Sequence, residues 1–480
     1  VEQMNLFKDM VCYQEEVRDP SRMAEVLNRV IEKAFRGSAP AQINVPRDFW
    51  TQVIDIELPP IVRFERQGGG KTAIDKASKI LSEARFPVIL SGAGVVIGEA
   101  IEECKKLAEK LDAPVCNGYQ HNDSFPGSHP MAVGPLGYNG SKAAMELISK
   151  ADVVLALGTR LNPFSTLPGY GIDYWPKNAT IIQVDMNPDR IGLTKKVTVG
   201  ICGDAKLVSQ QILEKLSSSA GDNGREERKN LIHQTKSAWL QTLTSLDHEE
   251  DDPGTVWNKE ARERDKNRMS PRQAWRAIQA GMPEDVIISS DIGNNCAIGN
   301  AYPTFEKGRK YLAPGLFGPC GYGFPSILGA KIGCPDTPVI GFAGDGAFGI
   351  SMNEMSSCAR KEWPAITMVI FRNYQWGAEK RNSILWFDDN FIGTELDPEL
   401  SYAKVANACG LKGVEAKTME ETTTAIKQSC EDQKKGITTF IEVILNQELG
   451  EPFRRDAMKK PVKVAGIKRE DMKPQKSING

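Results

Sequence analysis

The sequence has no long apolar run, few histidines and almost no net charge. The longest apolar stretches in its 480 residues are strand-sized, so nothing in the sequence is expected to span a bilayer. The formal net charge is −2, which gives no electrostatic reason to expect nucleic acid or an anionic membrane as a partner. The 4 histidines show neither HxxxH nor HExxH spacing, so a zinc hydrolase is not expected.

The sequence also lacks any CxxC pair. Its 10 cysteines are scattered, and several, such as Cys104 and Cys358, lie in segments expected to be buried. This pattern favours a reduced, cytoplasmic compartment. The composition, 40% hydrophobic and 25% charged, is ordinary for a globular protein. A chain of this length is too long for one core, so two or three domains are expected.

Two short apolar segments, 338–343 and 365–371, flank the motif Gly344-Asp345-Gly346-Ala347-Phe348. Both segments are predicted strands, and a helix is predicted to begin near Gly349 between them. Asn373 follows the second strand, so a strand–helix–strand unit would place it beside Asp345 at the edge where open α/β sheets bind ligands. A carboxylate, an amide oxygen and a nearby main-chain carbonyl suit Mg²⁺ carrying a diphosphate. The alternative is a tight turn and an unrelated asparagine.

This motif, with asparagine following after the second strand, resembles the signature of the thiamine diphosphate (ThDP) enzymes. The resemblance implies that Mg²⁺ is held by Asp345, Asn373 and the main chain of Gln375. It also implies a ThDP site made by the loop after another predicted strand, by a glycine-rich turn and by the motif itself. The predicted cofactor-binding residues are Gly293, Asn294, Asn295, Gly318, Cys320, Gly344, Asp345, Gly346, Ala347, Phe348, Asn373, Gln375 and Trp376. Many relatives place a bulky apolar residue at the position of Cys320, which is smaller.

Strands and helices alternate along most of the chain, which predicts parallel sheets. The expected fold class is α/β, with two consecutive doubly wound parallel-sheet domains preceded by the C-terminal remnant of a third. The predicted parts are a remnant of a pyrimidine-binding domain (1–56), a linker (57–71), a Rossmann-like central domain (72–216), a polar connector (217–268), a diphosphate- and Mg²⁺-binding domain (269–450) and a tail (451–480). The alternative for the first part is a small cap complete in itself.

Two features of the central domain invite a functional interpretation. The turn Ser91-Gly92-Ala93-Gly94 is similar to a dinucleotide fingerprint, but its third glycine, Gly98, comes one position late. A structural remnant is therefore favoured over a bound nucleotide. The polar stretch 116–123 is predicted to be a loop that lines an active site, with His121 as a candidate catalytic residue. The alternative is a solvated or capping histidine.

Three further stretches, 118–123, 373–382 and 447–457, resemble the sulfoacetaldehyde acetyltransferases among the ThDP enzymes. The resemblance implies conversion of sulfoacetaldehyde and phosphate to acetyl phosphate and sulfite, in taurine and sulfonate breakdown, by a dimer or tetramer. A sulfonate and a phosphate both need cationic donors, which are here predicted to be Lys380, Arg381, Arg454 and Arg455. The alternative is that these four residues form surface ion pairs.

The resemblance also implies an activating glutamate from the N-terminal domain, and no residue of this sequence can be assigned to it. Two alternatives therefore stay open. One is another ThDP carboligase or decarboxylase, similar to acetolactate synthase, which would share the metal motif without needing phosphate. The other is an inactive, truncated fragment that binds the cofactor.

Overall fold

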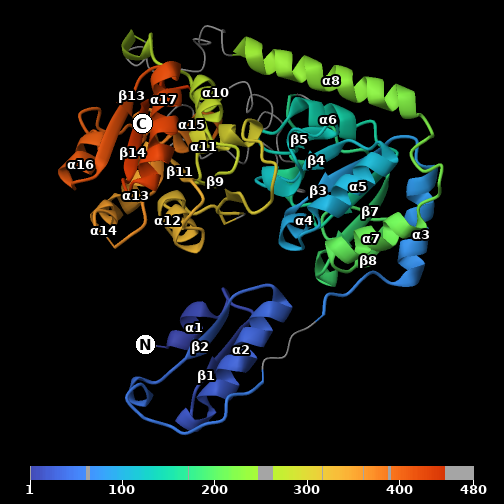
Figure 1. Cartoon of the computed structure of the whole chain (residues 1–480), viewed down its shortest axis with the longest axis horizontal. Helices are drawn as coiled ribbons and strands as arrows, with labels where there is room; N and C mark the ends of the chain where they lie inside the picture. The colour runs from blue at the N-terminus through green and yellow to red at the C-terminus, as the bar shows by residue number, and fades with distance from the viewer. Residues whose placement is uncertain are drawn as a thin grey trace, which may run out of the picture. The chain divides into compact units, whose positions relative to one another are not determined.

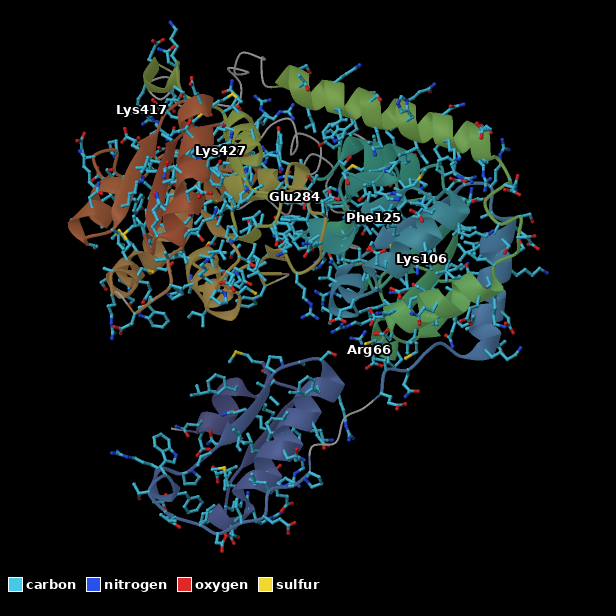
Figure 2. All side chains as sticks on the ribbon, viewed as in Figure 1. Arg66, Lys106, Phe125, Glu284, Lys417 and Lys427 are labelled. Atoms are coloured by element: carbon cyan, nitrogen blue, oxygen red, sulfur yellow. The ribbon has the colours of Figure 1, made fainter. Side chains whose placement is uncertain are left out.

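The computed structural model describes residues 2–60, 65–170, 172–246, 263–315, 317–360, 362–386 and 391–448 (Figure 1). The chain divides into two units, Val1–Glu65 and Arg66–Gly480. Arg66, labelled in Figure 2, is the first residue of the second unit. Among the described helices, none is both long and apolar enough to cross a membrane.

The first unit is an amphipathic helix packed on two parallel strands. The strands are β1 (Tyr13–Glu16) and β2 (Ala41–Asn44), and the connecting helix is α2 (Met23–Gly37). Val26 and Val30 of α2 are buried with Val17 in a small core. β1 has no sequence signal, because its Gln-Glu-Glu composition carries no apolar alternation. The unit also contains α1 (Gln3–Phe7), η1 (Pro20–Arg22) and η2 (Arg47–Phe49).

The second unit contains two six-stranded parallel sheets, which confirms the predicted fold class. The first of them has the strand order β5-β4-β3-β6-β7-β8. Its strands are β3 (Pro87–Ser91), β4 (Val115–Asn117), β5 (Ala132–Pro135), β6 (Val153–Leu157), β7 (Thr180–Asp185) and β8 (Val199–Cys202). The elements around it are α3 (Lys71–Glu83), α4 (Ala93–Ile97), α5 (Ile101–Leu111), η3 (Asn122–Ser124), α6 (Lys142–Ile148), η4 (Pro163–Thr166), η5 (Pro188–Arg190), α7 (Ala205–Lys215) and α8 (Arg225–Leu246).

Both faces of this central sheet are covered. Ile89 of β3 packs in one core cluster with Leu107 of α5, whereas its neighbours Val88 and Leu90 pack in another with Leu147 of α6. Successive side chains of a strand point to opposite faces, so β3 reads as a continuous apolar run because each face has its own helices.

The polar stretch 116–123 is not entirely a loop, and that prediction was wrong at its start. Cys116 and Asn117 end β4, which pairs with β3 and β5, and the Cys116 side chain is fully buried. A strand of three residues is too short to show a period of two, so the sequence carried no signal for β4.

The glycines after β3 are explained by close packing. The Gly94 N–H donates to the Gly158 carbonyl at 2.8 Å, and a β-carbon on Gly94 would lie 2.6 Å from the Gly158 α-carbon. Gly158 follows β6, and β3 and β6 are neighbours at the point where the strand order reverses. The two turns therefore meet where a nucleotide would sit in a doubly wound sheet. This packing supports the structural-remnant interpretation.

The stretch predicted as a polar connector contains the long helix α8. Its Arg228 side chain is fully buried and donates to main-chain carbonyls, among them those of Leu111 (2.9 Å) and Asp112 (2.9 Å). Ile232 joins the core of the central sheet, whereas Trp239 and Leu243 join a core cluster of the C-terminal sheet. Part of the connector is thus a structural element with apolar contacts to both sheets. The charge run at 248–254 lies outside the described residues.

The C-terminal sheet has the strand order β10-β9-β11-β12-β14-β13. Its strands are β9 (Ile287–Ser290), β10 (Tyr311–Leu312), β11 (Val339–Gly344), β12 (Thr367–Arg372), β13 (Lys412–Ala416) and β14 (Thr439–Ile444). The elements around it are α10 (Pro271–Gly281), α11 (Asn294–Ile298), η6 (Gly299–Ala301), α12 (Gly323–Gly333), α13 (Asp345–Ser351), η7 (Met352–Glu354), α14 (Met355–Cys358), α15 (Gly377–Trp386), α16 (Tyr402–Ala408) and α17 (Met419–Lys434). Figure 1 shows this sheet with helices around it.

The sheet order brings three strand ends together. β9 and β12 both pair with β11, and Gly344 of β11 lies opposite Phe371 of β12. Asp345 and Asn373 therefore leave the same edge of the sheet side by side, as the sequence predicted. The helix after the motif begins at Asp345 itself, and the prediction that it begins near Gly349 was wrong. The turn needs no extra residues because β11 leads directly into α13.

Candidate functional site at the edge of the C-terminal sheet

A cavity of about 190 Å³ opens at the carboxyl ends of β9, β11 and β12. Most of the predicted cofactor-binding residues line it. These are Gly293, Asn294, Asn295, Gly318, Cys320, Gly344, Asp345, Gly346, Ala347, Asn373, Gln375 and Trp376. Phe348 does not line it, because its ring packs in the core against Phe324 and Tyr402, with ring centroids 5.5 Å and 5.2 Å away.

Asp345 is a buried carboxylate whose two oxygens have different surroundings. Oδ1 accepts a hydrogen bond from the Gly346 N–H at 3.0 Å. Oδ2 accepts from the Tyr374 N–H at 2.6 Å and from Arg372 Nη1 at 3.1 Å. Burial raises the pKa of Asp345 to about 6, and the Arg372 guanidinium opposes that rise. The sequence had not identified Arg372. In the sequence, the feature that could have pointed to Arg372 is a charged residue at the end of an otherwise apolar strand.

Asn373 and Gln375 place two more oxygens beside Asp345. As placed, the Asn373 side-chain oxygen lies 3.3 Å from Asp345 Oδ1 and 3.3 Å from the Gln375 main-chain oxygen. Its side-chain nitrogen faces Nδ2 of Asn295 at 3.3 Å. Turning the amide over would turn these contacts into hydrogen bonds. The Asn373 amide thus lies 3.3 Å from two oxygens, and it can present either its nitrogen to them or its oxygen to a cation that they would share.

Tyr374 has a backbone conformation that only this site explains. Its φ of 61° lies in the left-handed region, which is uncommon for a residue with a bulky side chain. The reversal lets its neighbours Asn373 and Gln375 both turn toward Asp345. The Tyr374 ring is held by the Arg372 guanidinium, 4.2 Å from the ring centroid, and by that of Arg268, 4.7 Å away. Those contacts offset the strain.

Asn294 and Asn295 begin α11 after β9 and face the cavity. Both are buried, and neither polar atom of the Asn294 side chain has a hydrogen-bond partner among the described residues. The Asn295 main-chain carbonyl accepts from Trp275 Nε1 at 2.6 Å, which anchors the start of the helix. Burying an unpaired amide costs free energy, so Asn294 is poised for a polar ligand.

Asp291, which the sequence analysis did not select, holds the glycine-rich turn in place. Its Oδ1 accepts from the Gly321 N–H at 3.1 Å, and its Oδ2 accepts from the Gly323 N–H at 2.7 Å. The side chain is buried, and burial raises its pKa. Gly318 and Cys320 of this turn line the cavity. A charged residue directly after the apolar strand β9 was the available signal.

His121 does not line the cavity. It is half-buried, and burial together with the Arg160 guanidinium lowers the pKa of its imidazole to about 4. The ring is therefore neutral at pH 7, and it has no place in the cavity from which to touch a substrate. Its proposed catalytic part rests on sequence alone.

The rest of the polar loop around His121 joins the two sheets of the second unit. Asn122 Nδ2 donates to the carbonyls of Asn300 at 3.1 Å and Pro303 at 2.8 Å. Asp123 Oδ2 accepts from the Lys310 N–H at 2.9 Å. The segment that Asn122 contacts follows α11 directly. These hydrogen bonds therefore hold the end of the helix that carries Asn294 and Asn295.

Of the four predicted anion-binding residues, the structure describes Lys380 and Arg381, and neither lines the cavity. Lys380 is buried and forms an ion pair with Glu395. Arg381 is buried on the same helix, α15, and also does not line the cavity. Arg454 and Arg455 lie outside the described residues. For Lys380 an ion pair was the alternative given by the sequence, although only the lysine side is buried and the Glu395 side chain is about half exposed.

The ligand set of this site differs from those of common metalloenzymes. Within the described residues, no group of three or more histidine, cysteine, aspartate or glutamate side chains could hold a metal ion. The cavity instead offers one carboxylate, one amide and one main-chain carbonyl. Such an oxygen set suits a hard cation that keeps waters or phosphate oxygens in its remaining positions.

Two family models match this chain. The central domain of thiamine pyrophosphate enzymes matches residues 74–215, and the C-terminal, TPP-binding domain of these enzymes matches residues 291–443. The chain is 77% identical to a probable sulfoacetaldehyde acetyltransferase of Rhizobium meliloti (strain 1021), over 100% of this chain and 81% of the relative. It is 73% identical to a sulfoacetaldehyde acetyltransferase of Roseovarius nubinhibens, over 99% of this chain and 79% of the relative.

More distant proteins are similar over somewhat less of the chain. A probable acetolactate synthase large subunit of Methanococcus aeolicus is 27% identical over 89% of this chain and 71% of the relative. Benzoylformate decarboxylase from Polynucleobacter necessarius, a solved structure, superposes with a TM-score of 0.72 at 20% identity, covering 93% of this chain and 78% of that one. That structure supports the fold alone.

Proposed function

Because the chain belongs to the sulfoacetaldehyde acetyltransferases, a family of ThDP enzymes, we propose that it converts sulfoacetaldehyde and phosphate to acetyl phosphate and sulfite. The single observation that carries the proposal is the high identity, along the whole chain, to relatives that bear this name. The geometry of the cavity supports it, because the cavity offers what a diphosphate and a divalent cation need.

The metal of this proposal is Mg²⁺, held by Asp345 Oδ1, the Asn373 side-chain oxygen and the Gln375 main-chain oxygen. The observation that supports it is that the Asn373 side-chain amide lies 3.3 Å from both Asp345 Oδ1 and the Gln375 main-chain oxygen. Ligand oxygens around an octahedral Mg²⁺ lie about 3 Å from one another, which follows from a metal–oxygen distance of about 2.1 Å. The 3.3 Å spacing of the Asn373 amide from each of the two oxygens is close to that value.

The diphosphate would lie between this metal and the start of α11. Asn294 supplies unpaired amide atoms there, and a neutral amide can bind a phosphate oxygen without adding charge. Trp376 packs against the motif, because a β-carbon on Gly346 would lie 2.8 Å from its ring. The glycine thus keeps the main chain close to the ring and leaves the cavity open above it.

When bound, ThDP supplies a carbon that stabilises negative charge during carbonyl chemistry. The chain's own residues would bind the metal and the diphosphate and orient the cofactor. Asp345, Asn373 and Gln375 would hold the metal, and Asn294 and Asn295 would bind the diphosphate. Asp291 holds the turn that carries Cys320 at the cavity wall. Cys320 is exposed as a residue, but partial desolvation of its thiol, together with the nearby Asp291 and Glu379 carboxylates, raises the pKa of the thiol above its usual range.

The assay that tests the function is sulfite release by the full-length protein with ThDP, Mg²⁺, phosphate and sulfoacetaldehyde. We expect sulfite and acetyl phosphate in equal amounts, and no sulfite when phosphate is omitted. The Asp345→Ala protein is the matched negative control. A carbon–carbon bonded product formed without phosphate would assign the chain to the acetolactate synthase-like alternative instead. No turnover by a folded protein that binds ThDP would favour an inactive fragment.

We also propose that Arg454 or Arg455 binds the sulfonate or the acceptor phosphate. Loss of a charge-assisted contact costs about 1.5–3 kcal/mol, which corresponds to roughly ten- to a hundredfold in the affected step. Arg455→Ala is therefore expected to raise KM for one anion and leave ThDP affinity unchanged. Arg455→Lys should rescue only partly, because an ammonium lacks the bidentate fork. If Arg454→Ala and Arg455→Ala both keep normal KM values, the anion site must be sought at Arg381 or Lys380.

A further inference from the structure

Arg372 is a fully buried arginine at the end of β12, directly before Asn373. It forms ion pairs with two buried carboxylates, Asp345 at 3.1 Å from Nη1 and Glu442 at 3.5 Å from Nε. Its Nη2 donates to the carbonyls of Asp397 and Leu400, the latter at 2.9 Å. One side chain thus joins the metal-site carboxylate to β14 and to the segment before α16.

The two oxygens of Asp345 have different partners, because Arg372 contacts only Oδ2. Oδ2 is held by Arg372 and by the Tyr374 N–H, both on the protein side. Oδ1 lies 3.3 Å from the Asn373 side-chain amide and accepts a hydrogen bond from the N–H of its own neighbour Gly346. A carboxylate held in this way presents a single oxygen toward the cavity.

We propose that Arg372 is a positioning residue for the metal, which fixes Asp345 as a single-oxygen ligand and thereby favours Mg²⁺ over Ca²⁺. Mg²⁺ requires near-octahedral geometry, whereas Ca²⁺ accepts both oxygens of one carboxylate and a higher coordination number. Groups that hold a ligating carboxylate in this way typically contribute 10–100-fold to metal affinity. This inference rests on the proposed metal site.

Electrostatic repulsion alone predicts tighter Mg²⁺ binding after Arg372 is removed, whereas positioning predicts weaker binding, so an experiment can distinguish the two. A guanidinium this close to a cation repels it, so removing Arg372 without any effect on geometry would tighten Mg²⁺ binding. A lysine would keep the charge, but it cannot contact Asp345, Glu442 and two carbonyls at once, because it lacks the planar fork. If Arg372 acts by positioning Asp345, both the methionine and the lysine variants should bind Mg²⁺ more weakly than the wild type.

The experiment measures apparent Mg²⁺ and Ca²⁺ affinities by calorimetry at saturating ThDP, for the wild type and for Arg372→Lys and Arg372→Met. We expect Mg²⁺ affinity to fall about tenfold or more in both variants, with a smaller fall for Ca²⁺. The ratio of Mg²⁺ to Ca²⁺ affinity therefore decreases. An unchanged ratio, or tighter Mg²⁺ binding by Arg372→Met, would overturn the proposal.

The controls separate this inference from stability and from the proposed function. Arg228→Met removes another fully buried arginine, on α8, whose side chain donates to main-chain carbonyls such as those of Leu111 and Asp112. It should lower the melting temperature and leave metal affinity unchanged. Should Arg372→Met not fold, the double variant Arg372→Met/Glu442→Gln removes both buried charges and carries the same expectation. A wild type that binds ThDP equally well without any divalent cation would refute the metal site itself.

Discussion

Replacing Asp345 with alanine is expected to reduce ThDP binding in the presence of Mg²⁺ to an undetectable level. The substitution removes the one carboxylate among the proposed metal ligands, so the diphosphate charge loses its compensation. It also leaves the buried Arg372 with a single acidic partner, Glu442. The measurement is calorimetric titration with ThDP at fixed Mg²⁺.

Two further variants show whether the loss at Asp345 is specific. Asn373→Ala removes the amide ligand without breaking the buried ion pair, and it should also abolish or strongly weaken binding. Asp336→Ala removes an exposed aspartate before β11 and should bind ThDP as the wild type does. Wild-type affinity in both the Asp345→Ala and Asn373→Ala proteins would mean that the glycine-aspartate-glycine motif is only a turn.

Replacing Asp291 with asparagine is expected to weaken both the fold and the cofactor site. The two side chains have the same size, but one acceptor oxygen becomes an amide that faces a main-chain N–H. The Gly321 and Gly323 N–H groups are bound by different oxygens of Asp291, so either orientation of the amide leaves one of them unpaired. A buried unpaired donor costs about 1–3 kcal/mol.

The measurements are the melting temperature and the ThDP affinity of the Asp291→Asn protein. We expect melting several degrees lower and ThDP affinity reduced about tenfold, because Gly318 and Cys320 of the same turn line the cavity. Asp285→Asn is the matched control, since Asp285 precedes the same strand but is more than half exposed and is paired with Lys310. Lower stability with unchanged ThDP affinity would show that the turn does not shape the site.

The site could be predicted in part because its ligands follow from chain order. Asp345 and Asn373 each come directly after a buried apolar strand, and neighbouring parallel strands end at one edge. Local pattern is enough for such a prediction.

The residues that support the ligands escaped prediction because their partners are distant in sequence. Arg372 bonds a carboxylate 27 residues away, and Asp291 bonds an N–H 32 residues away. No periodicity reports which buried charge will meet which donor. The left-handed conformation of Tyr374 also has no local signal, since the residue type disfavours it and three arginine side chains lie over its ring.

The sequence by itself determined the α/β class, the longer apolar strands and the positions of the metal-ligand candidates, because apolar runs and strand ends are local properties. The tertiary structure alone decided how the polar groups are partnered. It buried Lys380 against Glu395, placed Asn122 and Asp123 on the segment after α11, and set Arg372 between Asp345 and Glu442. A buried polar group must find a partner or lose free energy, and which partner it finds depends on how distant segments pack.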